Sequence, residues 1–190
     1  MPTDLLAGPW GLAIMSLLVL GDSFFVVIPG EIAVTALGAV SSASASPPLW
    51  AVIVCAGVAA ALGDATVYVI GRTVGTERWR WMRAPRVQQA LTWARRRLDG
   101  GLAMVLFTGR FVPFARLAIN LVAGASRIHP SRYLCLAVAA ALGWAAYQAS
   151  VGALIAVIVP GGPVVAVLVS VAVAVGLGAA IDFATRRLRR

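Results

Sequence analysis

Long apolar segments alternate with short charged breaks along this chain. Residues 49–70 carry one charge, Asp64, and residues 133–159 carry none. Each stretch can therefore cross the roughly 30 Å hydrocarbon core of a bilayer, which takes about 20 helical residues. The apolar pattern of residues 164–181 predicts a last spanning helix. Residues 5–20 are also apolar, but this stretch is short for a membrane crossing. The pattern predicts an all-α integral membrane protein.

The stretch from Gly109 to Gly124 places two arginines inside an otherwise uncharged segment. Arg110 and Arg116 lie on either side of Pro113, which removes a backbone donor and interrupts a helix. An arginine at the bilayer centre costs roughly 2.5–3.5 kcal/mol on insertion scales, so such residues normally face protein or a water-filled cavity. We therefore predict two half-helices that meet at a polar tip, a re-entrant hairpin.

A similar break lies near the start of the chain, with acids in place of arginines. Asp22 and Glu31 flank Pro29 and Gly30, which predicts another re-entrant hairpin. One spanning helix separates the two breaks, so the hairpins should enter the membrane from opposite faces. Inverted repeats of this kind place a site where broken helices meet near the bilayer midplane. The acids and the arginines are expected to meet there.

The chain is expected to form a single membrane domain over residues 1–190. Its predicted parts are repeat 1 at about 21–71, a cytoplasmic segment at 72–99, repeat 2 at about 100–157, the last span at 164–181 and a basic tail at 182–190.

The cytoplasmic segment has the pattern of an amphipathic helix. Its apolar residues recur at helical spacing, at Val87, Leu91, Ala94 and Leu98. We expect this helix to lie in the membrane interface, where tryptophans suit the headgroup zone. The segment's tryptophans are Trp79, Trp81 and Trp93.

Composition supports a membrane location and sets the orientation. The chain is 61% hydrophobic, its mean hydropathy is +0.90, and all 16 basic side chains are arginines. Most of them lie between Arg72 and Arg97 or in the basic tail, and the positive-inside rule places both regions in the cytoplasm. The first region is expected to bind anionic membrane lipids. The net charge of +9 therefore does not call for a nucleic acid partner.

The arginines of the second break are candidates for binding a phosphate. Arg110 and Arg116 each offer a fork of donors that matches phosphate oxygens. Asn120 adds a polar group on the same stretch. In surroundings of low dielectric, two guanidinium groups can hold a phosphate whose charge would otherwise be too costly to carry through hydrocarbon.

The membrane acids are candidates for ion pairing or proton coupling. Asp22 and Glu31 can hold the arginines when the site is empty and take up protons when it is filled. Asp64 lies four residues before Tyr68, and a structural partnership and a proton-carrying role are both open for it. The alternative is a static ion cluster that only locks the hairpins together, since unpaired buried charges are costly whatever the function.

The motif Gly109-Arg-Phe-Val-Pro-x-x-Arg116, followed by Gly124 and an aromatic at Tyr133, resembles the DedA family of bacterial membrane proteins. The first half is similar too, with an acid at Asp22 and a Pro-Gly-Glu sequence ending at Glu31. The resemblance implies two opposed re-entrant hairpins among spanning helices. It also implies that Asp22, Glu31, Arg110 and Arg116 are the functional residues. Asn120 departs from the family, in which many members have proline there.

The function implied is translocation of a polyprenyl-phosphate carrier lipid, such as undecaprenyl phosphate, across the bacterial plasma membrane, coupled to protons or sodium. A proton-coupled transporter of a small solute or ion, or a broader phospholipid scramblase, could use the same hairpin site. An enzyme is not expected, because membrane lipid phosphatases usually need histidines and the chain has only His129. No metal or cofactor is expected, and formation of a homo-oligomer is left open.

Overall fold

Helices form nearly all of the described part of the protein. The computed structural model describes residues 8–25, 29–75, 83–99, 101–110 and 113–158. Within those ranges there is no strand, as the sequence predicted. The helices are α2 (Pro9–Asp22), α3 (Gly30–Ser44), α4 (Leu49–Val74), α5 (Pro85–Asp99), α6 (Leu102–Gly109), α7 (Pro113–Ala125) and α8 (Pro130–Ile158).

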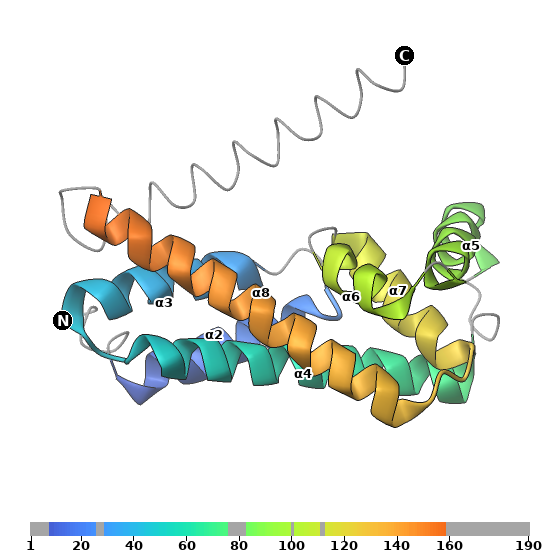
Figure 1. Ribbon diagram of the computed structural model, residues 1–190, viewed down its shortest axis with the longest axis horizontal. Helices are drawn as coiled ribbons and strands as arrows, with labels where there is room; N and C mark the ends of the chain where they lie inside the picture. Colours follow the sequence, from blue (N-terminus) through green and yellow to red (C-terminus); the bar gives the residue numbers. More distant parts are fainter. Residues whose placement is uncertain (1–7, 26–28, 76–82, 100, 111–112, 159–190) are drawn as a thin grey trace, which may run out of the picture.

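Two long helices, α4 and α8, run side by side in opposite directions along the whole molecule (Figure 1). Both are long and apolar enough to cross a membrane, as predicted. Helix α4 continues beyond residue 70 and ends before Gly75, whose positive φ of 75° is a backbone conformation that favours glycine. Helix α8 begins at Pro130, where a missing backbone N–H costs nothing. The predicted last span and the basic tail lie outside the described residues.

The outer faces of the long helices are apolar, as contact with lipid requires. Large hydrophobic side chains are exposed along both helices, among them Val58 and Leu62 on α4 and Val138 and Leu154 on α8. In water such a surface would be costly, whereas against hydrocarbon it is favourable. The two helices therefore present one face to the protein interior and another to the membrane.

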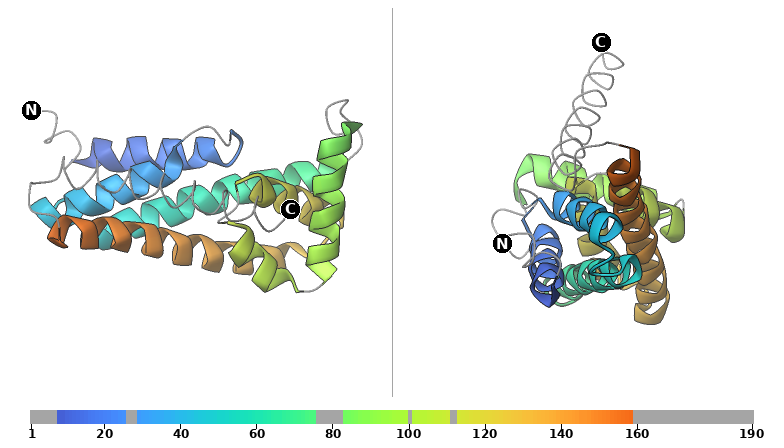
Figure 2. Two further views of the ribbon diagram at one scale, coloured as in Figure 1. Left: turned by 90° about the horizontal axis from the view of Figure 1, so that it is seen from above. Right: turned by 90° about the vertical axis from the view of Figure 1, so that its left-hand side faces the viewer.

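The short helices form two pairs at opposite halves of the molecule (Figures 1 and 2). Helices α2 and α3 cover one half of the long helices, and α6 and α7 cover the other. The longest of the four has 15 residues, or about 22 Å at 1.5 Å per residue, which is too short to cross a 30 Å core. Within the predicted apolar stretch 5–20, residues 9–20 belong to α2, which continues to Asp22 and forms the first arm of a helix pair. That the pairs are re-entrant hairpins in a membrane stays a prediction.

Four glycines bring two helix pairs into backbone contact: α3 with α8, and α4 with α7. At each of these two interfaces both helices contribute one glycine. Each glycine lies against the residue that comes three positions before the partner helix's glycine. The contacts are Gly38 on Ala149, Gly152 on Thr35, Gly124 on Tyr68 and Gly71 on Leu121. Small residues allow this close approach of membrane helices. Helix α3, the second helix of the first pair, therefore packs on α8, and α7, the second helix of the other pair, packs on α4.

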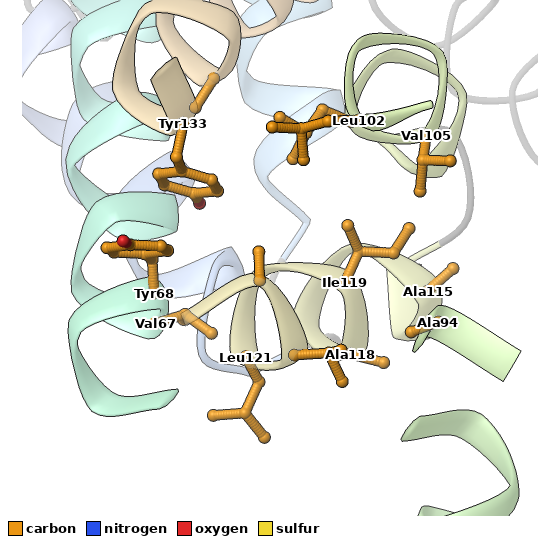
Figure 3. Close-up of a cluster of buried hydrophobic side chains, with 14 of the residues drawn as sticks. Val67, Tyr68, Ala94, Leu102, Val105, Ala115, Ala118, Ile119, Leu121 and Tyr133 are labelled. Carbon is orange, nitrogen blue, oxygen red and sulfur yellow. The ribbon is translucent and has the colours of Figure 1, made fainter. Parts of the chain in front are cut away.

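Helix α5 lies across one end of the molecule (Figure 2). The apolar stripe of α5 includes Leu91 and Ala94, which are buried in one core cluster with residues of α6 and α7 (Figure 3 labels Ala94). Helix α7 presents an apolar face of its own, including Ala118, which α5 covers. That α5 lies in the membrane interface stays a prediction. Trp93 lies on the other side and is exposed. The predicted headgroup tryptophans Trp79 and Trp81 lie outside the described residues.

The glycine contacts generate the first prediction. Gly71→Ala and Gly152→Ala should each lower the free energy of unfolding by about 1–3 kcal/mol, because the new methyl group would push a neighbouring backbone away. Thermal unfolding of the purified protein in detergent measures this loss.

Gly143→Ala is the matched control. Its methyl group would meet only the Phe107 ring, at 3.2 Å, and a side chain can move aside where a backbone cannot. Equal loss of stability in all three variants would show that close backbone approach is not what these glycines provide.

Candidate functional site

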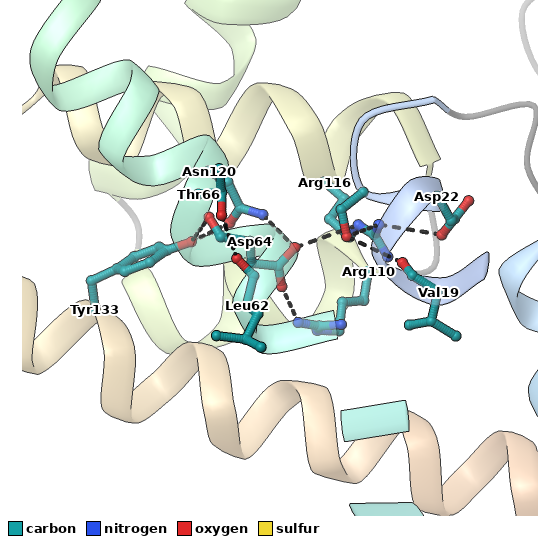
Figure 4. Close-up of polar contacts among 10 residues, drawn as sticks. Val19, Asp22, Leu62, Asp64, Thr66, Arg110, Arg116, Asn120 and Tyr133 are labelled. Carbon is teal, nitrogen blue, oxygen red and sulfur yellow. Dashed lines mark hydrogen bonds and ion pairs between the residues drawn. The ribbon is translucent and has the colours of Figure 1, made fainter. Parts of the chain in front are cut away.

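The carboxylate of Asp64 is the centre of a buried polar cluster (Figure 4). Asp64 lies in the middle part of α4 and is only 3% exposed. Its Oδ2 accepts a hydrogen bond and ion pair from Nη2 of Arg110, at the end of α6. Its Oδ1 accepts a hydrogen bond of 2.8 Å from Nδ2 of Asn120 and lies 3.6 Å from Nε of Arg116. Three side chains from the α6–α7 pair thus converge on one carboxylate.

Arg116 also reaches the first helix pair. Its Nη2 lies 3.2 Å from Oδ2 of Asp22, at the end of α2, and donates a hydrogen bond of 3.0 Å to Oγ of Ser23. Gly63 makes this approach possible, because a side chain there would overlap Ser23. The guanidinium group of Arg116 therefore connects the tip of α2, the middle of α4 and the start of α7.

Helical spacing aligns the polar residues on their own helices. On α7, Arg116 and Asn120 are four residues apart and face the same side. On α8, the hydroxyl of Tyr133 donates a hydrogen bond of 2.9 Å to Oδ1 of Asn120 and lies 3.1 Å from the backbone oxygen of Asp64. Tyr133 thereby orients the amide of Asn120 so that its Nδ2 points at the carboxylate.

A stacked aromatic pair supports this arrangement. The rings of Tyr68 and Tyr133 lie 4.1 Å apart and 15° from parallel (Figure 3). The hydroxyl of Tyr68 donates to the backbone oxygen of Ile128, and Nη1 of Arg72 donates to that hydroxyl at 3.0 Å. Tyr68 is therefore bound to the turn before α8 and not to the carboxylate of Asp64. The structural partnership considered for Asp64 and Tyr68 is not made.

The cluster is balanced in charge. It contains the carboxylates of Asp22 and Asp64 and the guanidinium groups of Arg110 and Arg116. Removing one member leaves an opposite charge buried without its partner, which typically costs 3–5 kcal/mol. The arrangement can therefore hold an anion in place of a carboxylate, or a proton in place of an arginine contact, with little change in net charge.

A narrow cavity lies beside the cluster and has no room for a water molecule. Its walls are Asp64, Leu106, Gly109, Arg110, Arg116, Ile119, Asn120, Ala137 and Ala140. A ligand the size of a phosphate can enter only if the surrounding helices move apart.

The structure brings together most of the residues that the sequence suggested, but with a different pairing. Asp22, Asp64, Arg110, Arg116 and Asn120 form one cluster. Glu31, expected to hold an arginine, instead lies exposed in the first turn of α3 and forms no ion pair within the described part of the chain. Asp64, left open from the sequence, is the shared partner of both arginines.

The glycines and prolines at the two helix breaks mainly allow close packing of the helix ends. A side chain at Gly30 would meet Asp22 at 3.0 Å, and one at Gly109 would overlap Ile119. Pro29 precedes the first residue of α3, and Pro113 is the first residue of α7. Each break therefore lets a helix end come close to the cluster.

Sequence reasoning missed two contributors to the site. Ser23 adjoins Asp22 at the tip of the first pair, and its position at the break was the available signal. Tyr133 was noted only as an aromatic of the motif, and nothing in its surroundings in the sequence indicated that it contacts Asn120. No group of histidine, cysteine or acidic residues within the described ranges could hold a metal ion.

Two membrane-length helices, two pairs of shorter helices and a buried charge cluster between them define a helical membrane protein with a polar site in apolar surroundings. The profile of the VTT domain, the domain of DedA and SNARE-associated proteins, matches residues 28–154. The chain therefore belongs to this family, which is one of membrane transporters and flippases. Comparisons with curated proteins and with solved structures gave no match.

The cluster generates the second prediction. Asp64→Asn should lower the free energy of unfolding by about 3–5 kcal/mol, because two buried arginines lose a charged partner. Asp22→Asn should cost less, since among the described residues Asp22 pairs only with Arg116 and its side chain is more exposed, at 14% against 4% for Asp64. Thermal unfolding in detergent compares the two variants. A larger loss for Asp22→Asn would contradict the central place of Asp64.

Proposed function

We propose that this protein translocates a polyprenyl-phosphate carrier lipid, of the undecaprenyl-phosphate kind, across the bacterial plasma membrane. The observation that carries the proposal is the pair of buried arginines, Arg110 and Arg116, held by carboxylates between two membrane-length helices. Membership of a family of membrane transporters and flippases supports it.

The arginines can bind the phosphate of a lipid as well as the carboxylates they now contact. A lipid phosphate carries its charge on several oxygens, and each guanidinium fork can bind two of them at once. In the closed cluster Nη2 of Arg110 and Nε and Nη2 of Arg116 contact the carboxylates of Asp64 and Asp22, whereas Nη1 of Arg110 has no hydrogen-bond partner among the described residues. A phosphate can therefore bind a guanidinium group beside its carboxylate partner or in place of it.

Charge balance couples this exchange to a cation. Because two carboxylates already match two guanidinium groups, an added phosphate leaves the buried site with excess negative charge. Uptake of protons by Asp22 or Asp64 restores the balance, and a sodium ion could do the same. Protonation also frees an arginine for the phosphate. Transport driven by protons or sodium follows from this exchange.

The same site suits other phosphate headgroups. A broader phospholipid scramblase would use the arginines in the same way, and a proton-coupled transporter of a small solute or ion would use only the acids and arginines. These alternatives differ from the proposal in what they move, so the lipid assay below separates them.

We also propose that the two halves form an inverted repeat with opposed re-entrant hairpins. The matched glycine contacts of α3 with α8 and of α4 with α7 support this, because each hairpin arm packs on the long helix of the other half at equivalent positions. In this proposal α5 and the C-terminus lie in the cytoplasm, which the arginine distribution supports.

The third prediction tests the phosphate site. Arg110→Lys and Arg116→Lys should fold and insert but lose transport, because lysine keeps the charge and loses the fork. The measurement is exposure of labelled undecaprenyl phosphate at the outer surface of proteoliposomes, with a labelled phospholipid assayed in parallel. Asp22→Asn and Glu31→Gln should alter the pH dependence of transport more than they alter expression.

A static ion cluster predicts a different result. In that case Asp64→Asn would lower stability, the double variant with Arg110→Gln would restore it, and transport would stay near the wild-type rate in the double variant. That combination would refute the phosphate site. Equal movement of both labelled lipids would favour a scramblase.

The fourth prediction concerns orientation. Cysteines placed at Ser44 and Ala84, both exposed, in a protein lacking Cys55 and Cys135 should react with impermeant reagents from opposite sides of the membrane. Helix α4 separates the two positions and Ala84 lies next to the arginine-rich α5. Labelling of both from one side would remove the inverted repeat from the proposal.

A further inference from the structure

The two arginines of the cluster are held in different ways. Arg116 uses Nε and Nη2 to contact Asp64, Asp22 and Ser23. Among the described residues, the polar partner of Arg110 is Asp64 alone, which it contacts through Nη2. Its Nη1 is buried, with no hydrogen-bond partner among the described residues, and the residue is 3% exposed. A buried charged donor without a partner is costly, so such a group calls for an explanation.

The surroundings of Arg110 on the side away from Asp64 are apolar. Small side chains of α8, Ala137 and Ala140, line the cavity there, and Leu106 lines it from α6. The guanidinium carbon of Arg110 lies 5.9 Å from the centre of the Trp144 ring, in cation–π contact. These side chains hold the planar group in place but offer its free N–H no oxygen acceptor.

We propose that Arg110, backed by Trp144 and the alanines of α8, is the subsite that receives the phosphate oxygens, and that Arg116 is a positioning residue that keeps the hairpin tips joined. This inference rests on the proposed function and assigns a different role in it to each of the two arginines. The phosphate needs no existing contact of Arg116 to be broken, because Nη1 of Arg110 is already available. Entry requires only that α6 and α8 separate around the cavity.

Helical spacing supports α8 as the wall of this subsite. Ala137, Ala140 and Trp144 recur at positions i, i+3 and i+7, so they lie along one face of α8. Ala139 points elsewhere and is exposed. A larger side chain at residue 140 would therefore occupy the space that must open for the phosphate, and one at residue 139 would not.

The test is binding of farnesyl phosphate, a soluble polyprenyl monophosphate, to the purified full chain in detergent. Equilibrium dialysis gives the affinity, and the part of the tryptophan fluorescence change that is absent in Trp144→Phe is assigned to Trp144, one of six tryptophans. Farnesol and inorganic phosphate serve as ligand controls and separate a lipid headgroup from free phosphate. Folding of each variant is checked by size-exclusion chromatography and circular dichroism.

We expect Arg110→Gln and Ala140→Leu to weaken binding of farnesyl phosphate at least tenfold. Ala139→Leu should leave binding unchanged, and Arg116→Gln should weaken it several-fold less than Arg110→Gln does, while abolishing transport. Quenching by the ligand should be smaller in Trp144→Phe. If Arg110→Gln does not fold, Ala140→Leu against Ala139→Leu decides the question, because neither changes a charge.

Two results would overturn the inference. Unchanged binding in Ala140→Leu would show that the cavity beside Arg110 does not receive the phosphate, and so would a greater loss in Arg116→Gln than in Arg110→Gln. Either result leaves the proposed transport standing if the lipid assay is positive. Binding of farnesyl phosphate no tighter than that of farnesol would instead remove the phosphate site, and with it the proposed function.

Discussion

The shared carboxylate of Asp64 is the interaction on which the rest of this structure depends. It is the partner of both Arg110 and Arg116, which come from a helix pair distant in the sequence. Charged groups in surroundings of low dielectric are tolerated only when they are paired, so the arginines fix where the tip of α6 and α7 lies. Asp22 and Ser23 then fix the tip of α2 against the same group. One charge cluster thus sets the meeting point of both helix pairs.

Packing and charge have separate roles in this fold. The glycine contacts hold α3 on α8 and α7 on α4 by backbone proximity, which needs no polar group. The charges are concentrated where the tips meet, and there the cavity is closed and narrow. A site of this kind can change its contents only when helices move. Binding of a phosphate and movement of the hairpins are consequently parts of one event in the proposed transport.

The sequence by itself determined the elements whose cause is local. The two membrane-length helices follow from uninterrupted apolar residues, and their prediction is confirmed. Helix breaks follow from Pro29 and Pro113, since proline acts on its own turn. The unusual burial of Arg110 and Arg116 also followed, because charges in an apolar segment must face a polar partner. Family membership was recognisable from the same motif and is shown by the VTT-domain match.

Tertiary structure alone decided the partners. Asp64 and Arg110 are 46 residues apart, and Tyr133 reaches Asp64 across 69 residues. No local pattern states which acid an arginine will meet, so the sequence favoured Glu31 as readily as Asp22 and left Asp64 open. The apolar stripe of α5 was ambiguous for the same reason. Its spacing requires an apolar neighbour but does not specify whether lipid or α7 provides it. Periodicity and charge determine which kind of partner each side chain requires. Only the packing of helices distant in the sequence determines which residue is that partner.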